Sequence, residues 1–261
     1  MSGHSKWHNI QHKKGLADAK RGKMFSKLIK ELTVAVKKGN SGDVNANPRL
    51  RLAVINARGA NMPKDTIERA IAKALGQGGA NFEEITFEAY GPSGEALYLE
   101  CTTDNKTRTV GNVRSYLNKF GGNLGKDGCL QFVFERKGNF VVKAENLSGD
   151  QLDEITLELI DAGAEEVEQE EGCILITTSR EGFGSVQKKL AALNLEVQEA
   201  NLEMIPNTTK DLSAEAYQKF LKLLDLMEDD EDVQKVYHNV TPQEVAADEE
   251  KWPIRLAVGR P

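Results

Sequence analysis

The chain has 261 residues, of which 39% are hydrophobic and 28% charged, a composition typical of a globular protein of two or three domains. No stretch approaches the ~20 apolar residues that a membrane-spanning helix requires, and no apolar run behind the N-terminus resembles a secretory signal. The three cysteines are odd in number and far apart, which argues against a disulfide framework and favours a reducing compartment. We therefore expect a cytoplasmic protein with no membrane partner.

The net charge of −6 conceals a strong asymmetry along the chain. Residues 1–75 hold 16 Lys and Arg against 5 Asp and Glu, whereas the remaining residues hold 18 against 35. A basic domain attracts phosphate by releasing counterions, while an acidic body resists lying on the same polyanion. This distribution predicts a nucleic-acid-binding protein that contacts its partner through the N-terminal third.

The first expected element is a mobile basic arm over residues 1–15, because this stretch has no apolar periodicity. Asp18 can cap a helix that continues to about Lys38 and ends at Gly39. At about 100° per residue, this helix has an apolar side and an opposite cationic side. The apolar side consists of Phe25, Leu28, Ile29, Leu32 and Val36. The cationic side consists of Lys20, Lys23, Lys27, Lys30 and Lys37.

Two further helices complete a small helical domain. Asn47 followed by Pro48 is typical of a helix start, and another helix is predicted to begin near Pro63. The glycine-rich stretch 76–79 ends the third helix and forms a hinge. The expected apolar residues of the two helices are Leu50, Leu52, Ala53 and Ala57, then Ile67, Ala70, Ile71, Ala74 and Leu75.

After these glycines, strands and helices alternate. Strands are expected at 85–90, 95–103 and 129–135, with a helix at 106–120. The next stretch has the order βαββαβ, the split arrangement of the ferredoxin-like fold. Its strands are expected at 139–144, 165–169, 172–178 and 196–200, and its helices at 150–162 and 181–193. A strand at 201–206, a helix at 213–228 and a strand at 233–239 follow.

The predicted fold class is α+β with three domains. The first is the helical domain, residues 1–79 with the arm. The second is a discontinuous α/β domain of residues 80–136 and 201–239, because its first elements are incomplete without the last three. The third is a ferredoxin-like domain, 137–200, inserted into it. Residues 240–261 form a tail.

The candidate nucleic-acid contacts lie in the basic third. Lysines position a protein on a phosphate backbone, arginines can fork onto phosphate or guanine, and an exposed tryptophan can stack on a base. The candidates are Lys6, Trp7, His8, Lys13, Lys14, Lys20, Arg21, Lys23, Lys27, Lys30, Arg49, Arg51, Arg58 and Lys64. The competing interpretation is a solvated helix face, which is disfavoured because the charge imbalance is so large.

Other motifs do not indicate catalysis or a cofactor. His4, His8 and His12 could share a helical face, but no carboxylate or cysteine accompanies them, so no metal site is expected. The loop 121–128 contains glycines and Lys126, yet Asp127 stands where a nucleotide-binding loop requires Ser or Thr. No nucleophile or paired carboxylate has a plausible partner. We expect no enzymatic activity, no cofactor and no small-molecule substrate.

Several ordered motifs resemble the YebC/PmpR family, and they extend from residue 2 to about Asn239. They are Gly3–Trp7, Asp18–Lys23, Asn61–Asp65, Ile67–Ile71, Tyr90–Pro92, Thr103–Asn105 with Arg108–Thr109, and Gly121–Gly125. The resemblance implies a helical N-terminal domain with two α/β domains. It also implies a probable transcriptional regulator that binds DNA. The same family includes mitochondrial translational activators and bacterial members linked to ribosomes.

Three functions stay open on the sequence. A DNA-binding transcriptional regulator would place Arg49, Arg51 or Arg58 in a groove, although no clear helix-turn-helix pattern is present. A translation factor would instead contact ribosomal RNA, which suits the basic arm and the acidic body. A scaffold would use its acidic α/β body to bind a basic protein.

Overall fold

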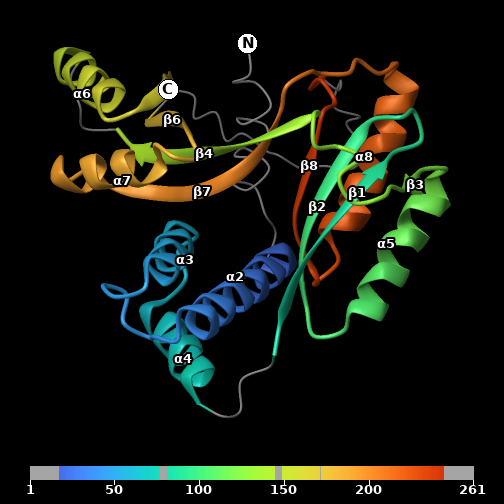
Figure 1. Ribbon diagram of the computed structural model, residues 1–261, viewed down its shortest axis with the longest axis horizontal. Coiled ribbons are helices and arrows are strands. Elements are labelled where there is room, and N and C mark those ends of the chain that lie inside the picture. The colour runs from blue at the N-terminus through green and yellow to red at the C-terminus, as the bar shows by residue number, and fades with distance from the viewer. Residues whose placement is uncertain (1–17, 77–80, 145–148, 171, 244–261) are drawn as a thin grey trace, which may run out of the picture.

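The computed structural model describes residues 18–76, 81–144, 149–170 and 172–243 (Figure 1). Three helices form the N-terminal part, and two separate four-stranded sheets with two helices each form the rest. Among the described residues, no helix combines the length and the apolarity that crossing a bilayer requires. The predicted α+β class with three domains is confirmed.

The helical domain consists of α2 (Asp18–Gly39), α3 (Pro48–Gly59) and α4 (Lys64–Leu75). Asn47 starts α3 as predicted, because its side chain accepts a hydrogen bond from the Leu50 amide at 3.1 Å. The predicted apolar faces meet in one core, with two exceptions. Leu75 is 59% exposed, and Leu52 packs against the core of the second sheet instead.

The first sheet is antiparallel, with the strand order β3-β1-β2-β8. Helices α5 and α8 lie together on one side of it and close its core (Figure 1). The predicted strand at 129–135 is wrong, since residues 127–133 form turns. The elements are β1 (Glu83–Tyr90), β2 (Ala96–Thr103), α5 (Lys106–Phe120), β3 (Asn123–Leu124), α8 (Ala214–Glu228) and β8 (Val233–His238).

The second sheet has the antiparallel strand order β5-β6-β4-β7. With the chain order βαββαβ, this is the ferredoxin-like arrangement that the sequence predicts. The core contains residues of α6, α7 and all four strands, and Phe140 stacks on Phe183 with ring centroids 4.5 Å apart. The elements are β4 (Phe134–Lys143), α6 (Gly149–Asp161), β5 (Ala164–Glu170), β6 (Cys173–Ser179), α7 (Phe183–Ala192) and β7 (Val197–Pro206).

Strands β4 and β7 extend beyond the second sheet to the first (Figure 1). They pair with each other from Phe134 opposite Pro206 to Val142 opposite Val197. At one end, Phe134 and Met204 pack with Tyr98 of the first sheet. The predicted strand breaks between 135 and 139 and between 200 and 201 are therefore wrong, because β4 and β7 are continuous there.

Gly111 in the middle of α5 offers a test of helix propensity. A Cβ built at this exposed position meets no atom within 4 Å. We expect Gly111→Ala to raise the free energy of unfolding by about 0.5–1 kcal/mol, because alanine loses less backbone entropy than glycine in a helix. Gly121→Ala is the control. Gly121 ends the same helix at φ 87°, which disfavours alanine, so this variant should be less stable than the wild type. Urea unfolding measures both, and a loss at Gly111 would contradict the expectation.

His238 makes the stability of the first sheet depend on pH. Its ring meets Phe220 edge-on with centroids 5.0 Å apart, and burial lowers its pKa to about 4, from an ordinary value of 6.5. The unfolded chain therefore binds the proton first as the pH falls. The stabilisation is complete above about pH 6.5 and is lost between about pH 6.5 and 4.

We expect the free energy of unfolding to fall by about 2 kcal/mol between about pH 7.5 and pH 5 because of His238. Urea unfolding of the wild type and of His238→Gln at both pH values isolates this contribution. The variant should show a correspondingly smaller decrease. Equal decreases in the two proteins would assign the pH dependence to other groups.

Candidate nucleic-acid interface

Helix α2 places Lys23, Lys27 and Lys30 on one face, as their spacing of four and three residues requires. We call these three side chains the lysine row. The face lies against the end of α8 and the chain that follows it, where five acidic residues stand in succession at Glu228–Asp232. We call this stretch the acidic segment. The lysine row therefore meets a dense set of anionic and carbonyl oxygens within the same molecule.

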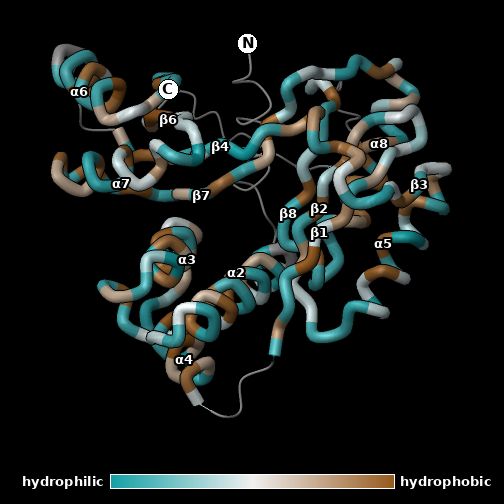
Figure 2. The backbone as a smooth tube through the Cα atoms, in the orientation of Figure 1, coloured by the Kyte–Doolittle hydropathy of each residue, from teal (hydrophilic) through white to brown (hydrophobic). Residues whose placement is uncertain are grey.

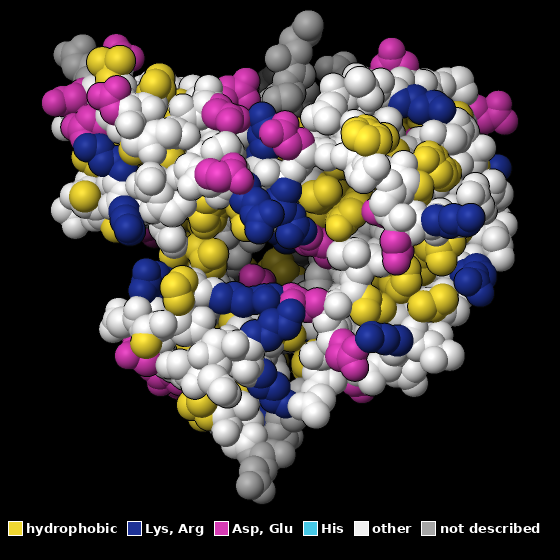
Figure 3. Space-filling model, viewed as in Figure 1, with side chains coloured by type: hydrophobic (Ala, Val, Ile, Leu, Met, Phe, Trp, Pro, Cys, Tyr) yellow, Lys and Arg dark blue, Asp and Glu magenta, His cyan; other side chains and the backbone are white. Residues whose placement is uncertain are grey.

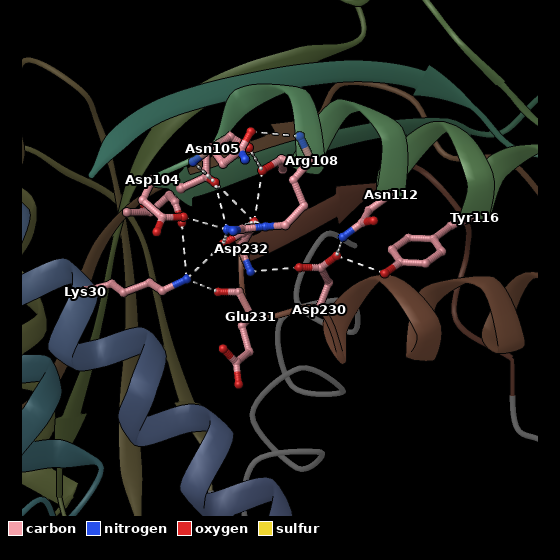
Figure 4. Close-up of polar contacts among 12 residues, drawn as sticks. Lys30, Asp104, Asn105, Arg108, Asn112, Tyr116, Asp230, Glu231 and Asp232 are labelled. Atoms are coloured by element: carbon pink, nitrogen blue, oxygen red, sulfur yellow. Dashed lines mark hydrogen bonds and ion pairs between the residues drawn. The ribbon is translucent and has the colours of Figure 1, made fainter. Parts of the chain in front are cut away.

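Each lysine of the row contacts the acidic segment. The Lys23 ammonium lies 3.1 Å from an Asp229 carboxylate oxygen. Lys27 donates to the Glu228 carbonyl at 2.7 Å. Lys30 donates to the Glu231 carbonyl at 2.8 Å and to Asp232 Oδ1 at 3.0 Å (Figure 4).

The lysine row is therefore not open to solvent along its whole length, since the Lys30 side chain is 14% exposed. Burial lowers the pKa of Lys27. The negative charges of Glu228, Asp230 and Asp229 act in the opposite direction, but burial outweighs them. Helical periodicity in the sequence identifies the face of α2 that lies opposite the core of the helical domain. It does not indicate that a second domain covers this face.

Asp232 is the most buried acid of the segment, at 3% exposure. Besides Lys30, its carboxylate accepts hydrogen bonds from Arg108 at 2.7 Å, Thr109 at 2.9 Å and Thr103 at 3.1 Å (Figure 4). Burial by itself would raise the pKa of Asp232, but the hydrogen bonds from Arg108, Lys30 and Thr109 outweigh it and hold the pKa below its ordinary value. The carboxylate is therefore ionised when it meets Lys30.

Asp230 is anchored separately from the lysine row. Its carboxylate accepts from the Asn112 amide at 3.0 Å and from the Tyr116 hydroxyl at 2.9 Å, both on α5 (Figure 4). Asp230 also accepts the amide of Asp232 at 2.8 Å. The acidic segment is therefore held in place by its own domain.

The arginines of α3 are divided between internal contacts and solvent. Arg49 forms an ion pair with Glu84, which also pairs with Lys38. Arg51 donates to the carbonyls of Val44 and Asn45, at 3.2 and 2.6 Å. Arg58 is exposed, and within the described part of the chain it has no hydrogen bond or ion pair.

Helix α3 also packs against β7 of the ferredoxin-like domain. The Asn56 side chain accepts the Ala200 amide at 3.0 Å and donates to the Ala200 carbonyl and to Asn201, at 3.3 and 2.9 Å. Gly59 lies so close to this strand that a Cβ would come within 1.8 Å of the Gln198 carbonyl oxygen. The arginine-bearing helix is therefore part of an interdomain contact.

The remaining predicted contacts are exposed or lie outside the described residues. Arg21 is exposed and lies over the Phe25 ring at 5.7 Å. Lys64 has a 78% exposed side chain, 3.6 Å from Glu68. Lys20 belongs to α2. Outside the described residues lie Lys6, Trp7, His8, Lys13 and Lys14, together with His4 and His12.

Figure 3 shows Lys and Arg side chains on both sides of a hollow at the centre of the visible face. Figure 2 shows that hydrophilic and hydrophobic residues alternate along α2 and α3. Within the described ranges, no group of three or more His, Cys, Asp and Glu side chains could hold a metal ion.

Sequence reasoning missed the acidic segment as the partner of the lysine row, and it missed Arg108 as a second cation on Asp232. A signal was present, because a run of five acids that begins at the last residue of an amphipathic helix is unusual for a helix end. Acidic groups at a helix C-terminus oppose the helix dipole and so require compensation. The compensating cations come from α2 and α5, about 200 and 120 residues away in sequence.

Two family models divide nearly the whole chain between them. Residues 5–77 match the TACO1/YebC protein N-terminal domain, and residues 82–240 match the TACO1/YebC second and third domain. The chain belongs to the TACO1/YebC family. The resemblance drawn from the sequence motifs is confirmed.

Similar proteins of this family carry a regulatory name. A probable transcriptional regulatory protein of Amoebophilus asiaticus (strain 5a2) is 50% identical over 242 residues, covering 92% of this chain and 98% of the relative. One from Geobacillus thermodenitrificans (strain NG80-2) is 51% identical over 241 residues, covering 92% and 97%. The protein ORF2U of Hathewaya histolytica, with the same description, is 50% identical over 92% of this chain and 96% of its own.

A solved member of the fold supports the architecture. The crystal structure of a conserved hypothetical protein, Aq1575 from Aquifex aeolicus, superposes with a TM-score of 0.76 at 40% sequence identity. The match covers 88% of this chain and 94% of that one. The TACO1/YebC fold of helical domain and two sheets is therefore common to both.

Proposed function

We propose that this TACO1/YebC protein is a non-enzymatic, cytoplasmic regulator of gene expression that binds nucleic acid through its N-terminal domain. The observation that carries the proposal is the segregation of charge, with 16 cations against 5 acids in residues 1–75. The relatives at about 50% identity are named probable transcriptional regulatory proteins, which agrees with such a role. Binding to duplex DNA is the specific form that the name suggests.

The chemistry of α2 fits a phosphate backbone. Lys30 stands seven positions after Lys23, so the lysine row extends about 10 Å along the helix axis. A nucleic-acid strand advances about 3.4 Å per nucleotide, so the row matches about three nucleotides. Contacts of this kind position a protein on the backbone without reading its sequence.

A second candidate is a translation factor that contacts ribosomal RNA, and one observation favours it. Helix α3 carries three arginines but lies against β7 through Asn56 and Gly59. A helix that reads a DNA major groove must be free to enter it. Recognition by backbone shape and by single-stranded segments, as is common for RNA, needs no such helix.

The first test measures binding of the full chain to a duplex DNA and to an RNA hairpin of equal length, by fluorescence anisotropy from about 50 to 200 mM salt. We expect the variant Lys20→Gln/Arg21→Gln/Arg58→Gln to bind about tenfold more weakly than the wild type. Its salt slope should fall by about one unit for each lost phosphate contact. Arg21 and Arg58 are exposed and have no described contact with the α/β domains, so the fold should persist.

The matched control replaces three exposed lysines outside the helical domain, Lys188, Lys219 and Lys222, by glutamine. This control should bind as the wild type does. An equal loss in both variants would mean that net charge alone, and not the N-terminal domain, governs binding. Absence of salt-dependent binding to either nucleic acid would overturn the proposed function.

Sedimentation of the native protein from a DNase-treated lysate separates the two candidate targets. Movement with ribosomes that is lost after RNase treatment would favour the translation factor. Recovery only at the top of the gradient would favour the transcriptional regulator.

A further inference from the structure

The acidic segment offers the lysine row the same chemistry as a nucleic-acid backbone. Five consecutive acids present closely spaced anionic oxygens, and three lysines bind them or the adjoining carbonyls at 2.7–3.1 Å. A phosphate backbone would use the same ammonium groups in the same way. The two ligands cannot occupy these groups together.

We propose that the acidic segment is an internal competitor for nucleic acid: it occupies the lysine row when the helical domain is docked, and a phosphate backbone displaces it. The inference rests on the proposed function and names the regulation of that same site. Free protein is then partly self-inhibited. Its apparent affinity is lower than the intrinsic affinity, in proportion to the fraction of undocked molecules.

The contacts suit a reversible exchange because the acids stay satisfied after the lysines leave. Asp232 retains Arg108, Thr103 and Thr109, and Asp230 retains Asn112 and Tyr116. Separation therefore leaves no buried carboxylate without a partner, which would otherwise cost several kcal/mol.

The contacts also differ in strength along the row. The Lys23–Asp229 pair is largely exposed, at 42% and 57% of the two side chains, and is screened by water and salt. The Lys30–Asp232 pair is buried, at 14% and 4%. A polyanion can thus displace the exposed end first and then proceed towards Lys30.

The decisive variant is Glu228→Gln/Asp229→Asn/Glu231→Gln, which removes three charges from the segment and leaves Asp230 and Asp232 in place. The matched control is Asp211→Asn/Glu215→Gln/Asp225→Asn, three exposed acids of the same domain with the same change in net charge. Affinity for the duplex and the hairpin is measured for both full-length variants by anisotropy. We expect the segment variant to bind about tenfold more tightly than the wild type, and the control at most about twofold more tightly.

Equal gains in affinity for both variants, or no gain in affinity for the segment variant, would overturn the competition. Binding by the wild type would still uphold the proposed function. If the wild type binds neither nucleic acid, both proposals fail. Hydrogen exchange of the wild type gives a second measurement that needs no substitution. Saturating nucleic acid should speed amide exchange over 229–232 and slow it in α2; unchanged exchange over 229–232 would also overturn the competition.

Discussion

Replacing Asp232 by alanine is expected to lower the free energy of unfolding by about 3–5 kcal/mol. The carboxylate is almost fully buried and accepts hydrogen bonds from Arg108, Lys30, Thr103 and Thr109. Removing it leaves the buried Lys30 without its carboxylate partner, and it leaves Arg108 only the exposed pair with Asp104. The loss is larger than that of any exposed ion pair, because water cannot replace the carboxylate.

Urea unfolding of Asp232→Ala, Asp232→Asn and Asp225→Ala checks this expectation. Asn keeps an acceptor oxygen, so the free energy of unfolding should fall less in Asp232→Asn than in Asp232→Ala. Asp225 is exposed on α8, and its replacement should change stability by less than about 0.5 kcal/mol. A loss below about 1 kcal/mol in Asp232→Ala would show that the hydrogen-bond network stabilises the fold little.

The second large effect is expected at Gly59, at the end of α3. In a helix, alanine is normally more favourable than glycine. Here the added Cβ would come within 1.8 Å of the Gln198 carbonyl oxygen of β7, and backbone cannot move aside as a flexible side chain can. We expect Gly59→Ala to cost about 3 kcal/mol and to separate α3 from the ferredoxin-like sheet.

Gly22→Ala is the matched control, because a Cβ on Gly22 of α2 meets no atom within 4 Å. Small-angle scattering should give a larger radius of gyration for Gly59→Ala and an unchanged one for Gly22→Ala. Urea unfolding should show a loss for the first and no loss for the second. Identical scattering of the two variants would contradict the close contact between α3 and β7.

Periodicity and capping residues were sufficient to predict the helical domain and the ferredoxin-like order. The predicted strand at 139–144 begins five residues after the actual start of β4 at Phe134, and Gly138 lies in the stretch that the prediction left out. A Cβ at Gly138 would come within 2.4 Å of Phe183, so the glycine lets α7 approach the strand. Lys137 pairs with Glu165 of β5 at 2.9 Å. Both contacts are tertiary, and a short stretch of sequence around Gly138 does not reveal them.

The candidate interface was predictable only in part. Helical spacing places Lys23, Lys27 and Lys30 on one face, but nothing local to α2 indicates that residues 228–232 cover it. The contacts of Arg49 and Asn56 with other domains likewise depend on how distant segments pack. The role of the chosen cations in nucleic-acid binding, and the domain boundaries at 79, 136 and 200, stay predictions.

The shared strands β4 and β7 have a mechanical consequence. Each is ten residues long, so together they form a twisted two-stranded ribbon about 30 Å in length. Its ladder is irregular only near Val141 and Val142. Rotating one α/β domain against the other would shear this ladder, so both domains should tumble as one rigid body. A force applied to α3 would be transmitted along β7 to the first sheet without passing through a hinge.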